Sequence, residues 1–345
     1  MGFTEFLQVP ELAERYQKVR KFFFLRESTY DITSICQLRC EGCYYYAGEK
    51  DSFHDNRNDP EAWRAFFEEE KKRGITFAVC AGAEPALAPA VLQACYDVIP
   101  LGTLASNGLK PISPSVGYKI QLSVWGDSTG DPIYRKFASG RPGPFCLPIQ
   151  LKNYKNDGRV IFIYTFNSEN ADQVDEVIDM VGTAGHRITF NVFSSTVGSN
   201  SSLKLRDMLK KTREKMFEAI EKYGDTVVYS YYAAEVHTDE RSLHDQFGCI
   251  YPRAMLATGQ TGRGIGQTFR SHRTDFSHKI ETDCCVPDMD CADCRHYGSG
   301  SAIIPSRLSL HGDSEQKFRG WLDYVDTYLE VFVNGYVKGE NLYKP

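Results

Sequence analysis

Residues 34–44 of this 345-residue chain read Ser34-Ile35-Cys36-Gln37-Leu38-Arg39-Cys40-Glu41-Gly42-Cys43-Tyr44. The three cysteines are spaced C-x3-C-x2-C, so one loop can turn all three sulfurs towards a single point. Thiolates grouped in this way hold iron–sulfur clusters, and three of them leave the fourth iron of a cubane open to another ligand. Zinc, with His54 as a fourth ligand, and ordinary buried thiols are the alternatives.

The composition limits the classes of function. A net charge of −5 and a pI near 6.0 argue against a nucleic-acid-binding protein, because phosphate affinity requires a basic face. The sequence shows no signal peptide and no apolar run long enough to span a membrane. Eleven cysteines without a secretory signal point to a reducing compartment, where thiols bind metals more often than they form disulfides. We therefore expect a cytoplasmic protein.

Short β-rich runs alternate with helical patterns between residues 29 and 230, which predicts βα units and a parallel sheet. The expected strands are 30–35, 75–80, 102–105, 120–124, 160–165 and 188–193. Helices are expected at 60–72, 89–98, 170–182 and 203–223. Six strands joined by helices, with chemistry at their carboxyl ends, describe an α/β fold of the partial (β/α)6 TIM-barrel type with a C-terminal extension.

Three regions follow from this pattern. Residues 1–28 form a helical lead-in, residues 29–230 the partial barrel, and residues 231–345 an extension that carries further cysteines. Apolar residues from Asp313 onward recur at helical spacing, so we expect an amphipathic helix that closes the side or the mouth of the barrel.

Polar motifs follow four successive predicted strands. The second is followed by Ala81-Gly82-Ala83-Glu84-Pro85, and the third ends in Ala105-Ser106-Asn107-Gly108. The fourth carries Gln121-Leu122-Ser123-Val124-Trp125-Gly126-Asp127, and the fifth ends near Thr165 and Asn167. Each motif alone is weak, because Asn-Gly and serine-containing turns are common. Their order after successive strands is specific.

Taken with the cysteine loop, these motifs resemble those of the radical S-adenosylmethionine (SAM) superfamily. The resemblance implies an open (β/α)6 barrel whose cluster loop, here Cys36, Cys40 and Cys43, follows the first strand and holds a [4Fe–4S] cluster. It also implies that SAM binds at the open iron and is cleaved reductively to a 5′-deoxyadenosyl radical, which acts on a substrate.

The resemblance assigns further roles around SAM. Gly82, Ala83 and Glu84 would take its amino group, since an iron-bound amine still has N–H donors to satisfy. Ser123 would bond its ribose or methionyl end, with Thr165 or Asn167 facing it. The remaining candidates are Asn107 after the third strand, Tyr44 or backbone alone for adenine, and Arg135, which is either a bidentate partner of the SAM carboxylate or a solvated surface charge.

The sequence departs from the family pattern at three positions. Ala83 stands where a second glycine is usual, and Trp125 stands where an aspartate is usual. Gly42 precedes the third cysteine, where the family often has an aromatic residue. These departures leave the backbone approach at Ala83 and the adenine contact open.

The last third of the chain contains Cys249, Cys284, Cys285, Cys291 and Cys294. Such cysteines resemble the auxiliary-cluster regions, called SPASM or twitch, of many radical SAM enzymes, although they suffice for one cluster and not two. Adjacent residues of an extended chain point to opposite faces, so we favour Cys285 over Cys284. Cys249, Cys285, Cys291 and Cys294 then hold a second [4Fe–4S] cluster, or zinc with help from His296, or no metal.

The expected function is radical chemistry on a small molecule such as a sugar, a nucleoside or a natural-product intermediate, with an electron donor such as flavodoxin or ferredoxin. The sequence offers no evident cobalamin-binding domain and little length before residue 29 for a leader-peptide-binding domain. An auxiliary-cluster dehydrogenase or peptide-modifying enzyme, and a non-enzymatic iron–sulfur or zinc module, are the alternatives. No catalytic side chain is assigned.

Overall fold

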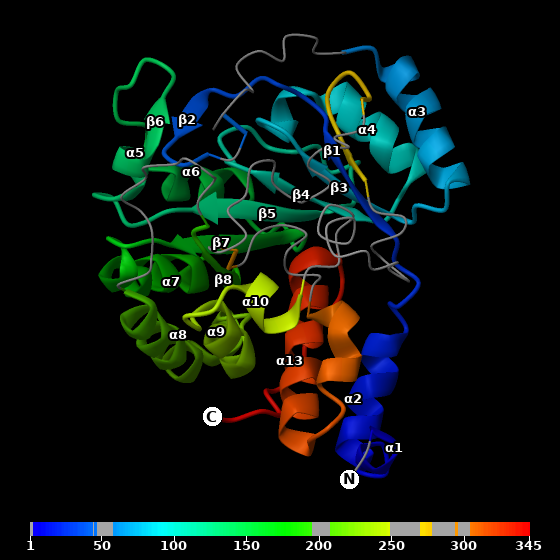
Figure 1. Cartoon of the computed structure of the whole chain (residues 1–345). Coiled ribbons are helices and arrows are strands. Elements are labelled where there is room, and N and C mark those ends of the chain that lie inside the picture. The colour runs from blue at the N-terminus through cyan, green and yellow to red at the C-terminus, as the bar shows by residue number, and fades with distance from the viewer. Residues whose placement is uncertain are drawn as a thin grey trace.

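The structure is a computed structural model, and it describes residues 3–43, 45–46, 58–194, 208–248, 270–277, 294–295 and 304–345. Six parallel strands form its centre, and they lie in space in the order in which they follow one another: β1 (Glu27–Asp31), β3 (Phe77–Ala81), β4 (Gly102–Ser106), β5 (Lys119–Val124), β7 (Val160–Phe166) and β8 (Ile188–Val192). A two-residue strand, β9 (Ser271–His272), pairs in parallel with β1 at the sheet edge. The expected α/β partial barrel is confirmed (Figure 1).

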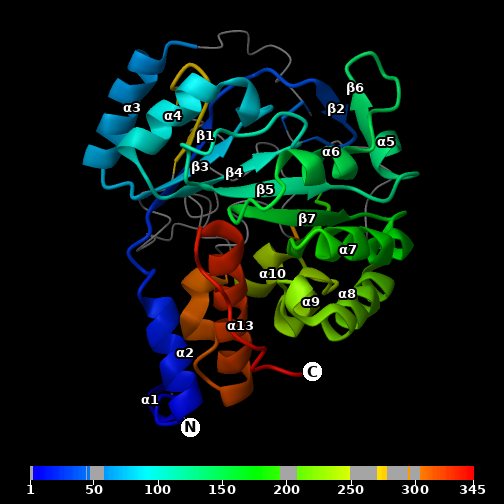
Figure 2. The ribbon, with the colours of Figure 1, turned by 180° about the vertical axis from the view of Figure 1, so that it is seen from behind.

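Helices follow the strands and cover the sheet (Figure 2). They are α3 (Pro60–Lys72), α4 (Pro89–Val98), α6 (Cys146–Asn153), α7 (Val174–Thr183) and α8 (Leu209–Tyr223), with 3-10 turns η2 (Pro85–Leu87), η3 (Ala171–Gln173) and η5 (Gly224–Thr226). Proline stands at the first turn of α3 and of α4, where its missing N–H costs nothing, and both helices have the predicted bounds. Tyr30 of β1 packs edge-on against Phe67 of α3.

Alternation along the strands separates the core from a cavity. In β5, Ile120, Leu122 and Val124 are fully buried in the hydrophobic core, whereas Gln121 and Ser123 line the cavity. Residues of β1 and of β8, the first and last of the six strands, line the same cavity, so the sheet curves around it. The cavity is therefore the interior of the partial barrel.

The first strand is displaced from its expected position. Residues 30–35 were expected, but β1 ends at Asp31. Beyond it the chain bonds to a loop instead of a strand: Thr33 O accepts from Ala83 N at 2.9 Å, and Ile35 O accepts from Glu84 N at 3.0 Å. This irregular pairing ties the cysteine loop to the loop that contains Glu84.

A small second sheet was not expected from the sequence. It consists of β2 (Leu38–Cys40) and β6 (Arg135–Phe137), which pair antiparallel with Cys40 opposite Arg135. The short helix α5 (Asp131–Tyr134) leads directly into β6. The second half of the cysteine loop is thus held by a segment almost a hundred residues away in sequence.

The long helix α13 (Glu315–Phe332) packs against α2 (Pro10–Arg20) and reaches the barrel interior (Figure 1). Its last residues, Val331 and Phe332, line the cavity, and Val331 O accepts from Gln121 Nε2 at 3.4 Å. Because Gln121 lies deeper in the barrel than the loops after the strands, α13 closes the base of the cavity and not its mouth. The remaining elements are α1 (Phe3–Phe6), α9 (Tyr231–His237), α10 (Leu243–Phe247) and η9 (Pro305–Leu310).

Across the described part of the chain, no helix combines the length and the apolar character needed to cross a membrane. The three regions expected from the sequence stay a prediction. Helices α2 and α13 come from opposite ends of the chain and pack on one another.

Candidate active site

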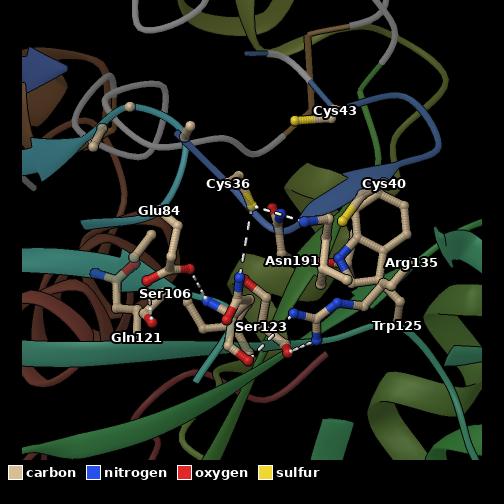
Figure 3. Close-up of a pocket in the computed structure, with 18 of the residues that line it drawn as sticks. Cys36, Cys40, Cys43, Glu84, Ser106, Gln121, Ser123, Trp125, Arg135 and Asn191 are labelled. Atoms are coloured by element: carbon tan, nitrogen blue, oxygen red, sulfur yellow. Dashed lines mark hydrogen bonds between the residues drawn. The ribbon is translucent and has the colours of Figure 1, made fainter. Parts of the chain in front are cut away.

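One cavity of about 220 Å³ lies at the carboxyl ends of the parallel strands and extends into the barrel. Figure 3 shows the side chains around it, with the three cysteines of the loop above Glu84, Ser106 and Ser123. The wall contains Cys36, Cys40, Cys43, Gly82, Ala83, Glu84, Asn107, Ser123, Arg135 and Thr165 from the predicted site. Ligands of parallel α/β barrels bind at this end, because loops from several strands meet there.

The cysteine loop turns sharply between its second and third cysteines. Cys43 N donates to Cys40 O at 3.1 Å, and Gly42 has a φ of +65°. A β-carbon at Gly42 would lie 2.5 Å from the ring of Phe193. Glycine is therefore required at position 42, because the turn is left-handed and Phe193 occupies the space beside it.

The three thiols lie close enough to influence one another. Burial raises the pKa of Cys36 to about 11, and the charges of Glu84 and Cys43 add to the effect. Burial also raises the pKa of Cys40 well above its usual range, against the opposing charge of Arg135. Cys36 Sγ accepts from Leu38 N at 3.3 Å and from Asn107 Nδ2 at 3.7 Å. N–H groups directed at a sulfur favour its thiolate form.

Among the described residues, no three His, Cys, Asp or Glu side chains could hold a single metal ion. His54, the fourth ligand of the zinc alternative, lies outside the described residues, so the choice between zinc and a cluster stays a prediction. In a cubane each thiolate binds a different iron, so the three sulfurs of a cluster site need not be as close together. Three cavity-lining thiols with N–H groups on Cys36 are a donor set that fits an iron–sulfur cluster.

Gly82 determines the shape of the loop after β3. Its φ is +100°, and a β-carbon there would lie 2.6 Å from Thr33 O. Only glycine allows this left-handed turn to approach the backbone after β1. Ala83 donates its N–H to the same Thr33 oxygen at 2.9 Å.

Glu84 is a buried carboxylate with three protein donors. Its Oε1 accepts from Ser106 Oγ at 2.7 Å and from Ala86 N at 3.0 Å, and its Oε2 accepts from Asn107 N at 2.7 Å. The side chain is 1% exposed, and burial raises its pKa despite these hydrogen bonds. Because a carboxylate has about four acceptor positions, Oε2 retains room for one more donor from the cavity.

Asn107 connects the Glu84 loop to the cysteine loop. Its backbone N–H contacts Glu84, and its side chain reaches Cys36 through Nδ2 and Gln37 through Oδ1, the latter at 3.5 Å. Gly108 follows at a φ of +69°. The Asn-Gly pair thus has a structural reason: the amide lies against the cysteine, and the glycine makes the turn that follows.

Arg135 is not a surface charge, which corrects one of the two alternatives from the sequence. It is 1% exposed, and its guanidinium donates to Ser123 O and, at 3.4 Å, to Asn107 O. Asp131 lies 3.6 Å from Nη1 and accepts from Trp125 N at 3.0 Å. Arg135 therefore joins the ends of β4 and β5 beneath Cys40. Its pairing with the SAM carboxylate stays a prediction.

The fifth-strand candidates have different surroundings. Thr165 lines the cavity, whereas Asn167 is absent from its wall and fully buried. Asn167 Oδ1 accepts from Glu169 N, and Asn167 N donates to Asn170 Oδ1, both at 2.9 Å. Of the two, Thr165 lines the cavity together with Ser123, from the strand that pairs with β5.

Several candidates cannot be placed. Tyr44, Cys249, Cys285 and Cys291 lie outside the described residues. Cys294 is described: it packs against the hydrophobic core, and its carbonyl accepts from Leu243 N at 2.8 Å. The auxiliary-metal prediction therefore stays open.

Sequence reasoning missed several residues of the cavity wall. Trp125 and Phe193 face each other edge-on with ring centroids 6.0 Å apart, and both line the cavity. Gln121 and Asn191 also line it. A signal was present: Gln121 lies two residues before Ser123 on one strand and therefore on the same face, and Asn191 interrupts an apolar strand.

Comparison with known proteins identified structural similarities only. No family model and no curated protein matches the chain. Streptococcus suis SuiB bound to S-adenosylmethionine is 17% identical at a TM-score of 0.49, over 76% of this chain and 62% of SuiB. Native anSMEcpe with bound AdoMet and Cp18Cys peptide is 15% identical at a TM-score of 0.49, over 89% and 96% of the two chains. Methylornithine synthase (PylB) is 14% identical at a TM-score of 0.37, over 62% and 72%. The chain thus spans about three fifths of the length of SuiB.

Proposed function

We propose that this chain is a radical SAM enzyme, which holds a [4Fe–4S] cluster through Cys36, Cys40 and Cys43 and acts on a small-molecule substrate. One observation carries the proposal. The three-cysteine loop lies at the carboxyl end of a six-stranded parallel partial barrel, in one cavity with Glu84, Asn107 and Ser123. Motifs that follow four strands at separate places in the sequence line one cavity, which supports the proposal.

Each wall residue has a role that its surroundings support. Glu84 offers an acceptor to the amino group of SAM, with the carboxylate held in place by Ser106 and Asn107. The hydroxyls of Ser123 and Thr165 are placed for the polar atoms of the ribose or methionyl end. Asn107 orients Cys36 through its N–H contact with the sulfur. Arg135 keeps the ends of β4 and β5 together beneath the site.

Cys36, Cys40 and Cys43 would hold the cluster, which when bound would supply the one-electron chemistry that cleaves SAM to methionine and a 5′-deoxyadenosyl radical. The protein binds and orients SAM and the substrate, and it excludes water. Trp125 and Phe193 cover one side of the cavity, and Val331 and Phe332 of α13 close its base. A partly apolar cavity with a closed base limits the access of water to a reactive species. The electron comes from a reduced donor such as flavodoxin or ferredoxin.

The direct test is spectroscopic. Protein reconstituted anaerobically with iron and sulfide and then reduced should give the electron paramagnetic resonance signal of one reduced cluster. Adding SAM should change that signal, because SAM binds at the open iron. A signal that SAM does not alter, or protein that takes up zinc in place of iron, would reject the proposal. Cys95→Ser, which alters a buried thiol on α4 outside the cavity wall, serves as the control and should keep the response.

The auxiliary-cluster alternative differs in its iron content. A dehydrogenase or peptide-modifying enzyme needs a second cluster as an electron acceptor, so about eight irons per chain would favour it and about four would favour the small-molecule proposal.

A further inference from the structure

The segments that pack behind the cysteine loop have a one-sided distribution of charge. Residues 98–126 and 132–156 contain no aspartate or glutamate, although the whole chain has a net charge of −5. Their charged residues are all basic: Lys110, Lys119, Arg135, Lys136, Arg141, Lys152 and Lys155. A cationic region on an acidic protein favours a partner of negative charge.

Four of these residues are exposed at one end of the barrel, and we call them the basic face. Lys152 lies in the last turn of α6, and Lys155 follows that helix. Tyr154 Oη donates to Lys110 O at 3.3 Å, which holds the loop after β4 against the end of α6. Arg141 lies in the turn that leaves β6. Figures 1 and 2 both show α6 at the same end of the barrel as β2, α5 and β6.

Nearby acidic side chains do not neutralise the basic face. Glu41 pairs with Lys136 at 3.4 Å, and Asp157 pairs with Arg159 at 2.6 Å. Asp131, which begins α5, is fully buried. Within the described part of the chain, none of the four exposed cations forms an ion pair. The free charge of this face is therefore positive.

Hydrogen bonds connect the basic face to the cysteine loop over a short path. Asn107 Nδ2 donates to Cys36 Sγ at 3.7 Å, and Gln150 Nε2 of α6 donates to Asn107 O at 2.9 Å. Arg135 of β6 donates to the same carbonyl at 3.4 Å and lies opposite Cys40 in the small sheet. Electron transfer between proteins slows steeply with distance. A face joined to the cysteines through one residue is therefore suited to receive an electron.

We infer that Lys110, Arg141, Lys152 and Lys155 form the docking face for an acidic one-electron carrier protein. This inference rests on the proposed function and adds the place where the electron donor binds. The carrier loses one electron and the cluster held by the cysteine loop gains it, so no proton or other group moves. Attraction between carboxylates of the carrier and the basic face raises the rate of encounter and orients the carrier on α6.

Reversing two charges tests the face without disturbing the fold. The double variant Lys152→Glu/Lys155→Glu alters two exposed side chains, so its melting temperature should stay close to that of the wild type. Lys21→Glu/Lys71→Glu is the matched control. Lys21 follows α2 and Lys71 lies in the last turn of α3, both exposed and away from α6, and the change in net charge is the same.

The experiment uses anaerobically reconstituted protein and a bacterial flavodoxin as the acidic carrier. Stopped-flow absorbance follows reduction of the cluster by reduced flavodoxin, and titration calorimetry measures the binding of oxidised flavodoxin. We expect Lys152→Glu/Lys155→Glu to slow the reduction about ten- to hundredfold at low salt and to weaken binding. The control variant should match the wild type, dithionite should reduce all three proteins equally, and high salt should remove the advantage of the wild type.

Equal rates and affinities in the wild type and Lys152→Glu/Lys155→Glu, an equal loss in the control variant, or no binding of flavodoxin would each overturn the inference. Tighter binding of a short single-stranded DNA than of flavodoxin would also overturn it, because the face would then be a phosphate site. Protein without a cluster that dithionite can reduce rejects the proposed function itself. Protein that dithionite reduces but flavodoxin does not bind rejects only the docking face.

Discussion

Glu84 shows how much a single residue depends on its neighbours. As part of a βα loop it would be an ordinary surface glutamate, but three donors and almost complete burial make it a fixed acceptor at the cavity wall. The raised pKa follows from that burial. Its position after a strand was predictable from the motif. Its partnership with Ser106 was not, because the contact depends on β4 lying beside β3.

We expect Glu84→Gln to keep the cluster and to weaken SAM binding. The variant loses a charge-assisted hydrogen bond, which costs about 1.5–3 kcal/mol, or about ten- to 150-fold in affinity. Equilibrium dialysis at matched iron content measures the change. Glu61→Gln on the exposed face of α3 is the control and should bind SAM as the wild type does. Unchanged affinity in Glu84→Gln would remove Glu84 from the SAM site.

At the scale of elements, α3 and α4 were predicted to the residue because Pro60 and Pro89 mark their first turns. The β2–β6 sheet could not be predicted, because each strand has three residues and the pairing is remote in sequence. That pairing buries Arg135 opposite Cys40, so the sequence could not distinguish a surface charge from a buried one. Sequence periodicity relates only neighbouring residues, so it could not show the remote β2–β6 pairing that buries Arg135.

Gly82→Ala and Gly74→Ala form a matched pair for the loop after β3. Both glycines have positive φ, +100° and +95°, but a β-carbon at Gly82 would lie 2.6 Å from Thr33 O, while one at Gly74 meets nothing within 4 Å. Gly74→Ala should cost about 1–2 kcal/mol of unfolding free energy from backbone strain alone. Gly82→Ala should cost about 1–3 kcal/mol more, because the loop must shift.

Denaturant unfolding compares the two variants, and SAM affinity should fall only in Gly82→Ala. Equal losses of stability would mean that the contact with Thr33 does not shape the loop.

A buried ionic cluster below the barrel joins α2, α13 and the C-terminal residues after α13. Asp326 pairs with Arg15 at 2.6 Å, and Glu330 pairs with Arg187 and accepts from Lys338 N at 2.8 Å. The amphipathic pattern of α13 predicted a packing helix. The pattern did not indicate that α13 closes the base of the cavity. Acidic residues such as Asp326 and Glu330 are usually exposed, and only the structure shows that Arg15 and Arg187 pair with them.

Asp323 makes the stability of this base depend on pH. Burial raises its pKa to about 6, against an ordinary value of about 3.9, although Arg15 lies 3.7 Å away. The folded state therefore holds the proton more tightly than the unfolded state, and stability falls as pH rises from about 4 to about 6. Asp323→Asn removes this loss. Between pH 4 and pH 7, the unfolding free energy of the variant relative to the wild type should therefore rise by roughly 1–3 kcal/mol.

Unfolding midpoints at the two pH values test this expectation. Asp313→Asn is the control: the exposed Asp313 has a lowered pKa because of its hydrogen bond with Lys317, so its removal should act in the opposite direction. A pH dependence identical in the wild type and Asp323→Asn would contradict the account.

The number of metal sites is a property of the whole chain. If Cys249, Cys285, Cys291 and Cys294 hold a second cluster, the variant with Cys36, Cys40 and Cys43 changed to Ala should still purify with about four irons and a thiolate-to-iron absorption band. About one zinc ion per chain, without an absorption band, would show that these cysteines bind zinc. The absence of any metal would show that they are structural thiols.

The central claim is that the cluster held by the cysteine loop cleaves SAM. The amount of 5′-deoxyadenosine that the reduced protein forms tests this claim most directly. Anaerobically reconstituted wild-type protein with dithionite and SAM should form 5′-deoxyadenosine and methionine, and the variant in which Ala replaces Cys36, Cys40 and Cys43 should form neither, whatever iron it retains elsewhere. Formation of 5′-deoxyadenosine by that variant, or its absence from wild-type protein that carries a reducible cluster, would contradict the account.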